Sequence, residues 1–219
     1  VPYYTEDLSI MNSYLNNLTL KNPESLKSLT YNSTSVLDLK SIASCTNLEE
    51  IDLSSSANIK NPSELFKFPN LANVSLDDYA PIWLDADTYT KLKDSKIVHE
   101  PYDLRAECTY LDHVATNIKN SGSSSKERVA EVVKYIKGKY FYNKDLMGNN
   151  DDFFRYQLLV DYNVYPIETL TNKDGVVCIN FATLYEALLN RLGIECYTLV
   201  SSDHAWNIYR KDDKLQAID

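Results

Sequence analysis

The chain has no cluster of basic residues and no long apolar run, and each absence excludes a class of function. Lysine and arginine total 22 against 31 aspartates and glutamates, which gives a net charge of −9. Because nucleic-acid-binding proteins need concentrated positive charge to neutralise phosphates, we expect no nucleic-acid partner. No apolar stretch has the length of about 20 residues that a helix needs to cross a bilayer. The acidic surface would also be repelled by anionic lipids, so we expect no membrane insertion.

The sequence also has no close pair of cysteines. Its four cysteines, Cys45, Cys108, Cys178 and Cys196, are widely and irregularly spaced. A disulfide framework, a zinc site or a C-x-x-C redox centre would show closely spaced pairs. The spacing therefore favours one reactive thiol and three buried ones, and it predicts neither a metal site nor another cofactor.

The N-terminal part of the chain contains a repeated pattern. Four blocks, LKSLTY, LEEIDL, LANVSL and LKDSKI, begin at Leu26, Leu48, Leu71 and Leu92, at steps of 22, 23 and 21 residues. Each follows an L-x-x-L-x-L frame, except that Ser95 occupies the middle position of the last block. Asn47 and Asn70 directly precede the second and third blocks. Such a period predicts one short strand and one return segment per repeat, stacked over a continuous core. Unrelated strands with leucines at chance intervals are the alternative.

This frame resembles the leucine-rich repeat, and its short period resembles the internalin type. Apolar residues in the segment before the repeats, Leu8, Met11, Leu15 and Leu18, have a helical spacing. The segment is therefore predicted to be a helical cap that shields the first repeat. The predicted domains of this part are an N-terminal helical cap at 1–22 and leucine-rich repeats at 23–100.

The pattern changes after His99, and residues 101–219 are predicted to form one α+β domain. Amphipathic helices are expected over 102–120, over 126–140 with a capping box of Ser124 and Glu127, and over 178–192 with Gly193 at its end. A further short helix is expected at 151–162. Three strands, 194–201, 205–210 and 214–219, are expected to follow, with a turn in the sequence KDDK.

Three polar residues of this domain, Cys178, His204 and Asp219, occur in the order nucleophile, base and orienting acid. A cysteine becomes a good nucleophile when it loses its proton, and a helix N-terminus or a neighbouring imidazolium favours that loss. Cys178 is predicted to begin a helix. An acidic group behind an imidazole fixes its tautomer, which Asp219 can do for His204. Taken singly, each of these residues is more often structural, and only their combination indicates a catalytic site.

Three stretches around these residues resemble the transglutaminase-like superfamily, which has a papain-like core with a Cys–His–Asp triad. The stretches are GVVCINFATLYEALLNRLGIECYTLVS, HAWNIY and LQAID. They contain Gly175 shortly before Cys178, Leu-Gly-Ile at 192–194, Ala-Trp-Asn directly after His204, and Asp219 at the end of the last strand. The resemblance covers about residues 104–219, and the sequence HAWN is its most specific part. Members of the family usually continue beyond the aspartate.

The resemblance implies a role for each residue. Cys178 would be the nucleophile, His204 the general base and acid, and Asp219 the orienting group of a thioacyl-enzyme mechanism. The oxyanion hole would use the backbone N–H of Cys178 and the side chain of Tyr142 or Tyr140. Trp206 would either shield the histidine from water or be an ordinary core residue. No acidic loop matches the calcium site of the larger animal transglutaminases.

The expected fold is thus a papain-like, transglutaminase-like α+β core after a short leucine-rich-repeat solenoid. The expected function is a cysteine-dependent peptidase, amidase or Gln–amine crosslinking enzyme that acts on a protein or peptide substrate. The alternative is a non-catalytic adhesion protein whose repeats bind a protein partner. The domain combination suggests a bacterial protein that is secreted or located at the cell surface. The initial valine is compatible with removal of a signal peptide. The sequence does not identify the substrate or the acyl acceptor.

Overall fold

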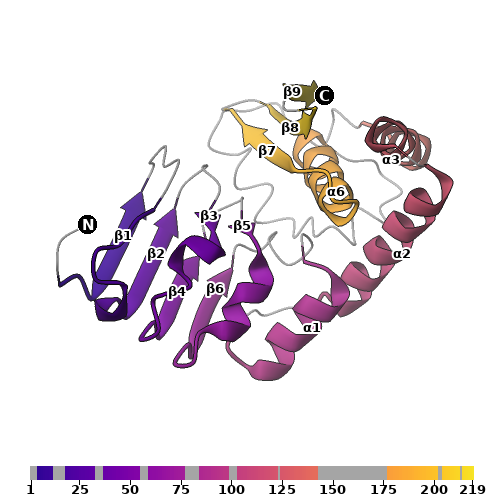
Figure 1. Ribbon diagram of the computed structural model, residues 1–219. Coiled ribbons are helices and arrows are strands. Elements are labelled where there is room, and N and C mark those ends of the chain that lie inside the picture. Colours follow the sequence, from indigo (N-terminus) through magenta and orange to yellow (C-terminus); the bar gives the residue numbers. More distant parts are fainter. Residues whose placement is uncertain are drawn as a thin grey trace, which may run out of the picture. The chain divides into compact units, whose positions relative to one another are not determined.

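A computed structural model of the protein describes residues 4–11, 18–32, 37–54, 59–76, 84–98, 103–122, 124–142, 177–201, 204–212 and 214–219. The chain divides into two compact units, Val1–Arg105 and Ala106–Asp219. Figure 1 shows the helices and strands of both. The division lies close to the position at which the sequence pattern changes, after His99.

The first unit is built on a parallel sheet whose strands lie side by side in the order β1-β2-β4-β6 (Figure 1). These strands are β1 (Asp7–Met11), β2 (Ser28–Asn32), β4 (Glu50–Leu53) and β6 (Asn73–Leu76). Two shorter parallel strands, β3 (Leu37–Asp38) and β5 (Ile59–Lys60), form a second ladder. Short 3-10 helices occupy the return segments, at Pro23–Ser25, Leu39–Ile42 and Pro62–Lys67.

The register of the parallel sheet explains why the leucine pattern repeats. Leu29 lies opposite Ile51, and Ile51 lies opposite Val74, so equivalent residues of successive blocks stack in one fully buried row. The two asparagines noted in the sequence also connect neighbouring blocks: Asn47 Nδ2 donates to the Glu24 carbonyl at 2.8 Å, and Asn70 Nδ2 to the Thr46 carbonyl at 3.0 Å. The strands predicted in the first three blocks are therefore present.

The segment predicted to be an N-terminal helix contains a strand instead. Residues Asp7–Met11 form β1 and pair in parallel with β2 along their whole length. Ile10 is buried while its neighbours Ser9 and Met11 are exposed, which is the two-residue alternation of a strand. Pairing with an available sheet edge has overridden a weak helical spacing, so the prediction of a helix was wrong here. Leu15 lies outside the described residues.

The fourth block is also not a strand. Leu92 is buried on helix α1 (Ala86–Ser95), whose first turn is capped by Asp85 through a 2.8 Å hydrogen bond from the Thr88 N–H. The parallel pairing resumes only at Val98, which forms a bridge with Val74. The serine in the middle of this block, Ser95, is the last residue of the helix. The loss of the apolar frame at that position thus marks a real change of structure.

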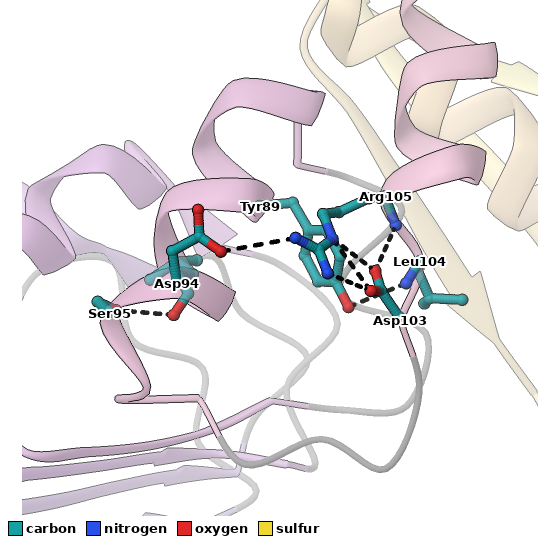
Figure 2. Close-up of polar contacts among 7 residues, drawn as sticks. Tyr89, Asp94, Ser95, Asp103, Leu104 and Arg105 are labelled. Carbon is teal, nitrogen blue, oxygen red and sulfur yellow. Dashed lines mark hydrogen bonds and ion pairs between the residues drawn. The ribbon is translucent and has the colours of Figure 1, made fainter.

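A polar cluster fixes the end of the first unit, where α2 begins (Figure 2). The Leu104 N–H donates to the hydroxyl of the buried Tyr89 at 3.1 Å. The Arg105 guanidinium binds the Asp103 carboxylate through Nε at 2.9 Å and also lies 3.5 Å from Asp94. The hydrogen bond from Arg105 lowers the pKa of Asp103 to about 2, so this carboxylate stays ionised throughout the neutral range.

The second unit combines helices with an antiparallel sheet, as the sequence predicts. Its elements are α2 (Arg105–Ser121), α3 (Ser125–Lys139), α6 (Cys178–Arg191), β7 (Cys196–Val200), β8 (Ala205–Lys211) and β9 (Lys214–Ile218). The three strands pair antiparallel in the order β7-β8-β9, and α6 packs against β7, β8 and α3. The helix predicted at 151–162 lies outside the described residues.

The predicted start of α3 and end of α6 are confirmed, whereas α2 begins at Arg105 rather than at 102. Ser124 Oγ accepts a hydrogen bond from the Glu127 N–H at 3.2 Å, and Glu127 Oε2 accepts one from the Ser124 N–H at 2.8 Å, which completes the capping box of α3. Gly193 follows the end of α6 with φ of 74°. This left-handed conformation suits glycine because it has no Cβ.

Replacing Gly193 by alanine is expected to destabilise the second unit by about 1 kcal/mol, measured by urea-induced unfolding. No atom lies within 4 Å of the added Cβ, so the cost comes from backbone strain rather than from a clash. Gly138→Ala is the matched control: it also meets no atom within 4 Å, but it lies inside α3. We expect this variant to be stabilised by a few tenths of a kcal/mol up to about 1 kcal/mol. Equal effects of the two substitutions would contradict the strain argument.

Candidate active site

Cys178 is the first residue of α6 and follows Val177, whose backbone is extended. Asn180 Oδ1 accepts a hydrogen bond from the Val177 N–H at 3.0 Å, while the N–H groups of Asn180 and Phe181 bond to the Val177 carbonyl at 3.1 and 3.2 Å. The Cys178 N–H donates to no described residue. The helix start thus presents a backbone donor and the positive end of the helix dipole next to the thiol.

The four cysteines differ in accessibility. Cys178 is partly exposed, whereas Cys45, Cys108 and Cys196 are buried. Burial raises the pKa of the Cys45 thiol to about 11, with a smaller contribution from the negative charge of Glu24. Burial, followed by the charge of Glu186, also raises the pKa of Cys196. Cys178 is therefore the one thiol of the chain that a reagent or substrate can reach in the folded protein.

The structure brings His204 and Asp219 together. His204 directly precedes β8 and Asp219 directly follows β9, and these strands are antiparallel neighbours, so the two residues meet at one end of the sheet. His204 Nε2 lies 2.8 Å from Asp219 Oδ1. Because a carboxylate only accepts hydrogen bonds, Nε2 carries the proton, and the lone pair of the neutral ring is on Nδ1. That nitrogen is the one able to accept a proton from a thiol.

Two neighbours hold the imidazole. The His204 backbone is fixed by Ser201, whose Oγ accepts from the His204 N–H at 3.1 Å and whose N–H donates to the His204 carbonyl at 2.8 Å. The Trp206 ring stacks on the imidazole, with centroids 5.9 Å apart and planes 18° apart. Trp206 thus packs beside the imidazole, a contact that its predicted shielding role requires.

The register between α6 and the sheet shows how Cys178 lies relative to His204. Reading toward the start of α6, Asn190 contacts Cys196, Glu186 contacts Thr198, and Ala182 contacts both Thr198 and Asn207. From Asn190 to Glu186 the helix rises by four residues, about 6 Å, while the partner on β7 moves by two residues, about 6.6 Å. One further turn leads to Cys178, at the end of α6 that lies toward the beginning of β8.

Among the described residues, no hydrogen bond joins Cys178 Sγ to His204. Catalytic hydrogen bonds are often long in a free enzyme and tighten when substrate binds. The register therefore places the two residues at the same end of the unit, and their direct pairing stays a prediction.

The two tyrosines considered for the oxyanion hole have different surroundings. The Tyr142 ring stacks on Phe181, with centroids 6.3 Å apart, so it lies against the first turn of α6. Tyr140 is buried instead beside Tyr135 and Tyr110, and its pKa is raised, first by burial and then by Tyr110. Of the two, Tyr142 is the one that a described contact connects to the helix of Cys178.

The family comparison agrees with the fold of this unit. Residues 109–211 match a family model described as a transglutaminase-like domain. The match runs from α2 to the end of β8, so it includes Cys178 and His204, whereas Asp219 lies beyond it. It supports a possible cysteine-dependent enzyme. No curated protein matches the chain significantly.

The described part of the chain contains no group of three or more histidine, cysteine, aspartate or glutamate side chains arranged to hold a metal ion. None of the described helices has both the length and the hydropathy of a membrane span.

Sequence reasoning missed a buried polar network beneath the candidate site. Glu186 Oε2 accepts hydrogen bonds from the Thr198 N–H, at 2.9 Å, and from the Thr198 hydroxyl. Asn207 Nδ2 donates to the Ala182 carbonyl at 2.9 Å and to Thr198 Oγ1 at 3.1 Å. The sequence contained two signals: a glutamate between apolar neighbours on a helix, and the asparagine of HAWN.

The Glu186 carboxyl makes stability depend on pH. Burial raises its pKa from 4.5 to about 8, although the hydrogen bonds from Thr198 partly oppose the shift. Between these values the folded state holds a proton that the unfolded state releases, so stability falls as pH rises, by at most about 1.4 kcal/mol per pH unit. Glu186→Gln is expected to flatten this slope between about pH 5 and 8 in urea unfolding. An unchanged slope would show that Glu186 is not the group responsible.

Proposed function

We propose that Cys178, His204 and Asp219 form the catalytic triad of a cysteine enzyme that acts on protein or peptide amides. The observation that carries this proposal is the 2.8 Å hydrogen bond between His204 Nε2 and Asp219 Oδ1. It leaves Nδ1 as the free base and stabilises the imidazolium that forms when the thiol loses its proton. The accessible position of Cys178 at the start of α6 supports the same assignment.

The reaction begins when His204 Nδ1 takes the proton of the Cys178 thiol and Sγ attacks the amide carbonyl. The Cys178 N–H, with Tyr142 as a candidate second donor, stabilises the negative oxygen of the tetrahedral intermediate. The C–N bond then breaks, and the imidazolium gives its proton to the leaving amine. The product is a thioester on Cys178.

The acceptor decides whether the enzyme is a hydrolase or a crosslinking enzyme. Water or a lysine amine attacks the thioester, His204 takes the proton of the attacking group, and the thiolate leaves and is reprotonated. Both outcomes use the same three residues. Product analysis of the acyl-enzyme with and without an added amine separates them.

We further propose that the first unit is a leucine-rich-repeat array that binds a protein partner, in a bacterial protein that is secreted or at the cell surface. The outward positions of its parallel strands support a binding surface, because they are polar and stacked in register, as in the row Thr30, Asp52 and Ser75. Such stacked rows are typical of repeat proteins that bind other proteins.

The catalytic proposal is tested by the rate of iodoacetamide alkylation of each cysteine, followed by mass spectrometry across pH. An ordinary thiol has a pKa near 8.5 and reacts slowly in mild acid. At about pH 6 we expect Cys178 to react at least ~10-fold faster than glutathione, and His204→Ala to remove that advantage. His113→Ala is the matched control, because His113 is an exposed histidine of α2. The proposal fails if His204→Ala leaves the rate unchanged.

A further inference from the structure

We propose that Asn207 is a positioning residue that holds β8 against α6 and thereby sets His204 relative to Cys178. This inference rests on the triad proposed above. Asn207 touches neither the thiol nor the imidazole, and it acts through the two elements that carry them. Its hydrogen bonds run from the strand that begins beside His204 to the helix that begins at Cys178.

The contacts of Asn207 lie just below the candidate active site. Its side chain is fully buried, and Nδ2 donates to the Ala182 carbonyl at 2.9 Å. Ala182 is one helical turn after Cys178, and Asn207 is three residues after His204. Nδ2 also donates to Thr198 Oγ1 at 3.1 Å, which connects the third element, β7, to the same point.

The hydrogen bond from Asn207 to Ala182 fixes the register of β8 and α6 in a way that apolar packing does not. Apolar side chains tolerate small displacements along an interface, whereas a bond between a side-chain amide and a single carbonyl fixes the register of strand and helix. A slip of one residue along β8 would move His204 by about 3.4 Å and turn it to the other face of the sheet. A misplacement of about 1 Å can already cost an enzyme about 100-fold in rate.

The second polar atom of the side chain supports positioning over simple stabilisation. Asn207 Oδ1 is buried and accepts no hydrogen bond from the described residues. A buried acceptor left in that state costs about 1–3 kcal/mol. The described contacts of this amide are therefore those of its Nδ2 donor, which joins β8 to α6 and β7 as a positioning role requires.

Asn190 provides a matched control on the same helix. Its side chain joins α6 to β7, with Nδ2 donating to the Cys196 carbonyl at 3.2 Å and Oδ1 accepting from the Cys196 N–H at 3.0 Å. It lies at the opposite end of α6 from Cys178. Asn190→Ala thus removes the same kind of contact from a place where it does not set the position of His204.

The test compares Asn207→Ala with Asn190→Ala by thermal unfolding and by the pH profile of Cys178 alkylation. We expect both variants to unfold at lower temperature, but only Asn207→Ala to lower the alkylation rate at about pH 6, by about 10-fold or more. The inference is overturned if Asn207→Ala keeps a rate within about twofold of the parent.

If Asn207→Ala does not fold, Asn207→Asp is used, since it keeps the side-chain volume. An ionised carboxylate cannot donate to the Ala182 carbonyl, whereas the protonated acid can. Cys178 alkylation relative to the parent should therefore fall as the introduced carboxyl ionises. A constant ratio across pH would contradict the inference.

A second readout separates this inference from the catalytic proposal. In His204→Cys, a disulfide between Cys178 and the introduced thiol reports whether positions 178 and 204 face each other, independently of catalysis. We expect it to form with Asn207 present and to form at least ~10-fold more slowly with Asn207→Ala. If it depends on Asn207 but the parent thiol is not activated, the positioning role stands and the catalytic proposal falls. If it does not form in His204→Cys, both are overturned.

Discussion

Replacing Cys178 by alanine is expected to abolish formation of the acyl-enzyme. With p-nitrophenyl acetate, the parent should release nitrophenolate in a burst of one equivalent per chain and gain an acetyl group on Cys178. The variant should lose this burst and react at least ~1,000-fold more slowly, because no other group on the triad can form the thioester. Stopped-flow absorbance measures the burst, and peptide mapping by mass spectrometry locates the acetyl group.

The other cysteines supply the control for this experiment. Cys108 is buried on α2, so Cys108→Ala should keep the full burst. A burst that persists in Cys178→Ala would assign the acylation to a different nucleophile and remove the basis of the proposed reaction.

Replacing Asp112 by alanine is expected to destabilise the second unit by about 3 kcal/mol. The Arg191 side chain is only 5% exposed, and its Nε donates to Asp112 Oδ1 at 2.7 Å. Nη1 of the same guanidinium donates to the Ala187 carbonyl at 3.0 Å. Removing the carboxylate leaves a buried positive charge without its ion-pair partner on α2. This ion pair between α2 and α6 is then lost.

The change in the free energy of unfolding should be measured with urea and followed by Trp206 fluorescence. A Trp83→Phe background makes Trp206 the only fluorescent tryptophan, so the signal comes from the second unit. Glu131→Ala is the control, because the Glu131–Lys134 pair on α3 is largely solvated, with 40% and 77% of the side chains exposed. We expect a change below about 0.5 kcal/mol for this exposed pair. Similar effects of the two substitutions would show that the Arg191–Asp112 contact has no special weight.

The elements that the sequence predicts well are those whose pattern is long or repeated. Leu104, Cys108, Leu111, Ala115 and Ile118 mark one stripe of α2 over several turns, and all are buried. The predicted helix before the repeats rested on only a few apolar residues, and one of them, Leu8, also fits the alternation around Ile10. Pairing with strand β2 decides whether such a short segment forms a helix or a strand. The sequence of the segment itself does not specify that pairing.

The candidate active site also combines features that the sequence predicts with features that depend on three-dimensional contacts. Cys178, His204 and Asp219 were predicted from residue type, order and the family resemblance, and the contact between His204 and Asp219 follows from two neighbouring strands that end at the same edge. The roles of Asn207 and Glu186 were not predicted, because their partners, Ala182 and Thr198, are set by the register between helix and sheet. That register is a three-dimensional property that neither segment encodes alone.

The matched step of α6 and β7 limits how the length of this domain can change. Four helical residues rise about as far as two strand residues, so the contacts of Asn190 with Cys196 and of Glu186 with Thr198 remain aligned only while both elements keep their lengths. A single residue inserted into β7 between Thr198 and Ser201 would turn its following side chains to the opposite face. Insertions and deletions are therefore compatible with the site only in coupled sets, a full turn in the helix with an even number of residues in the strand.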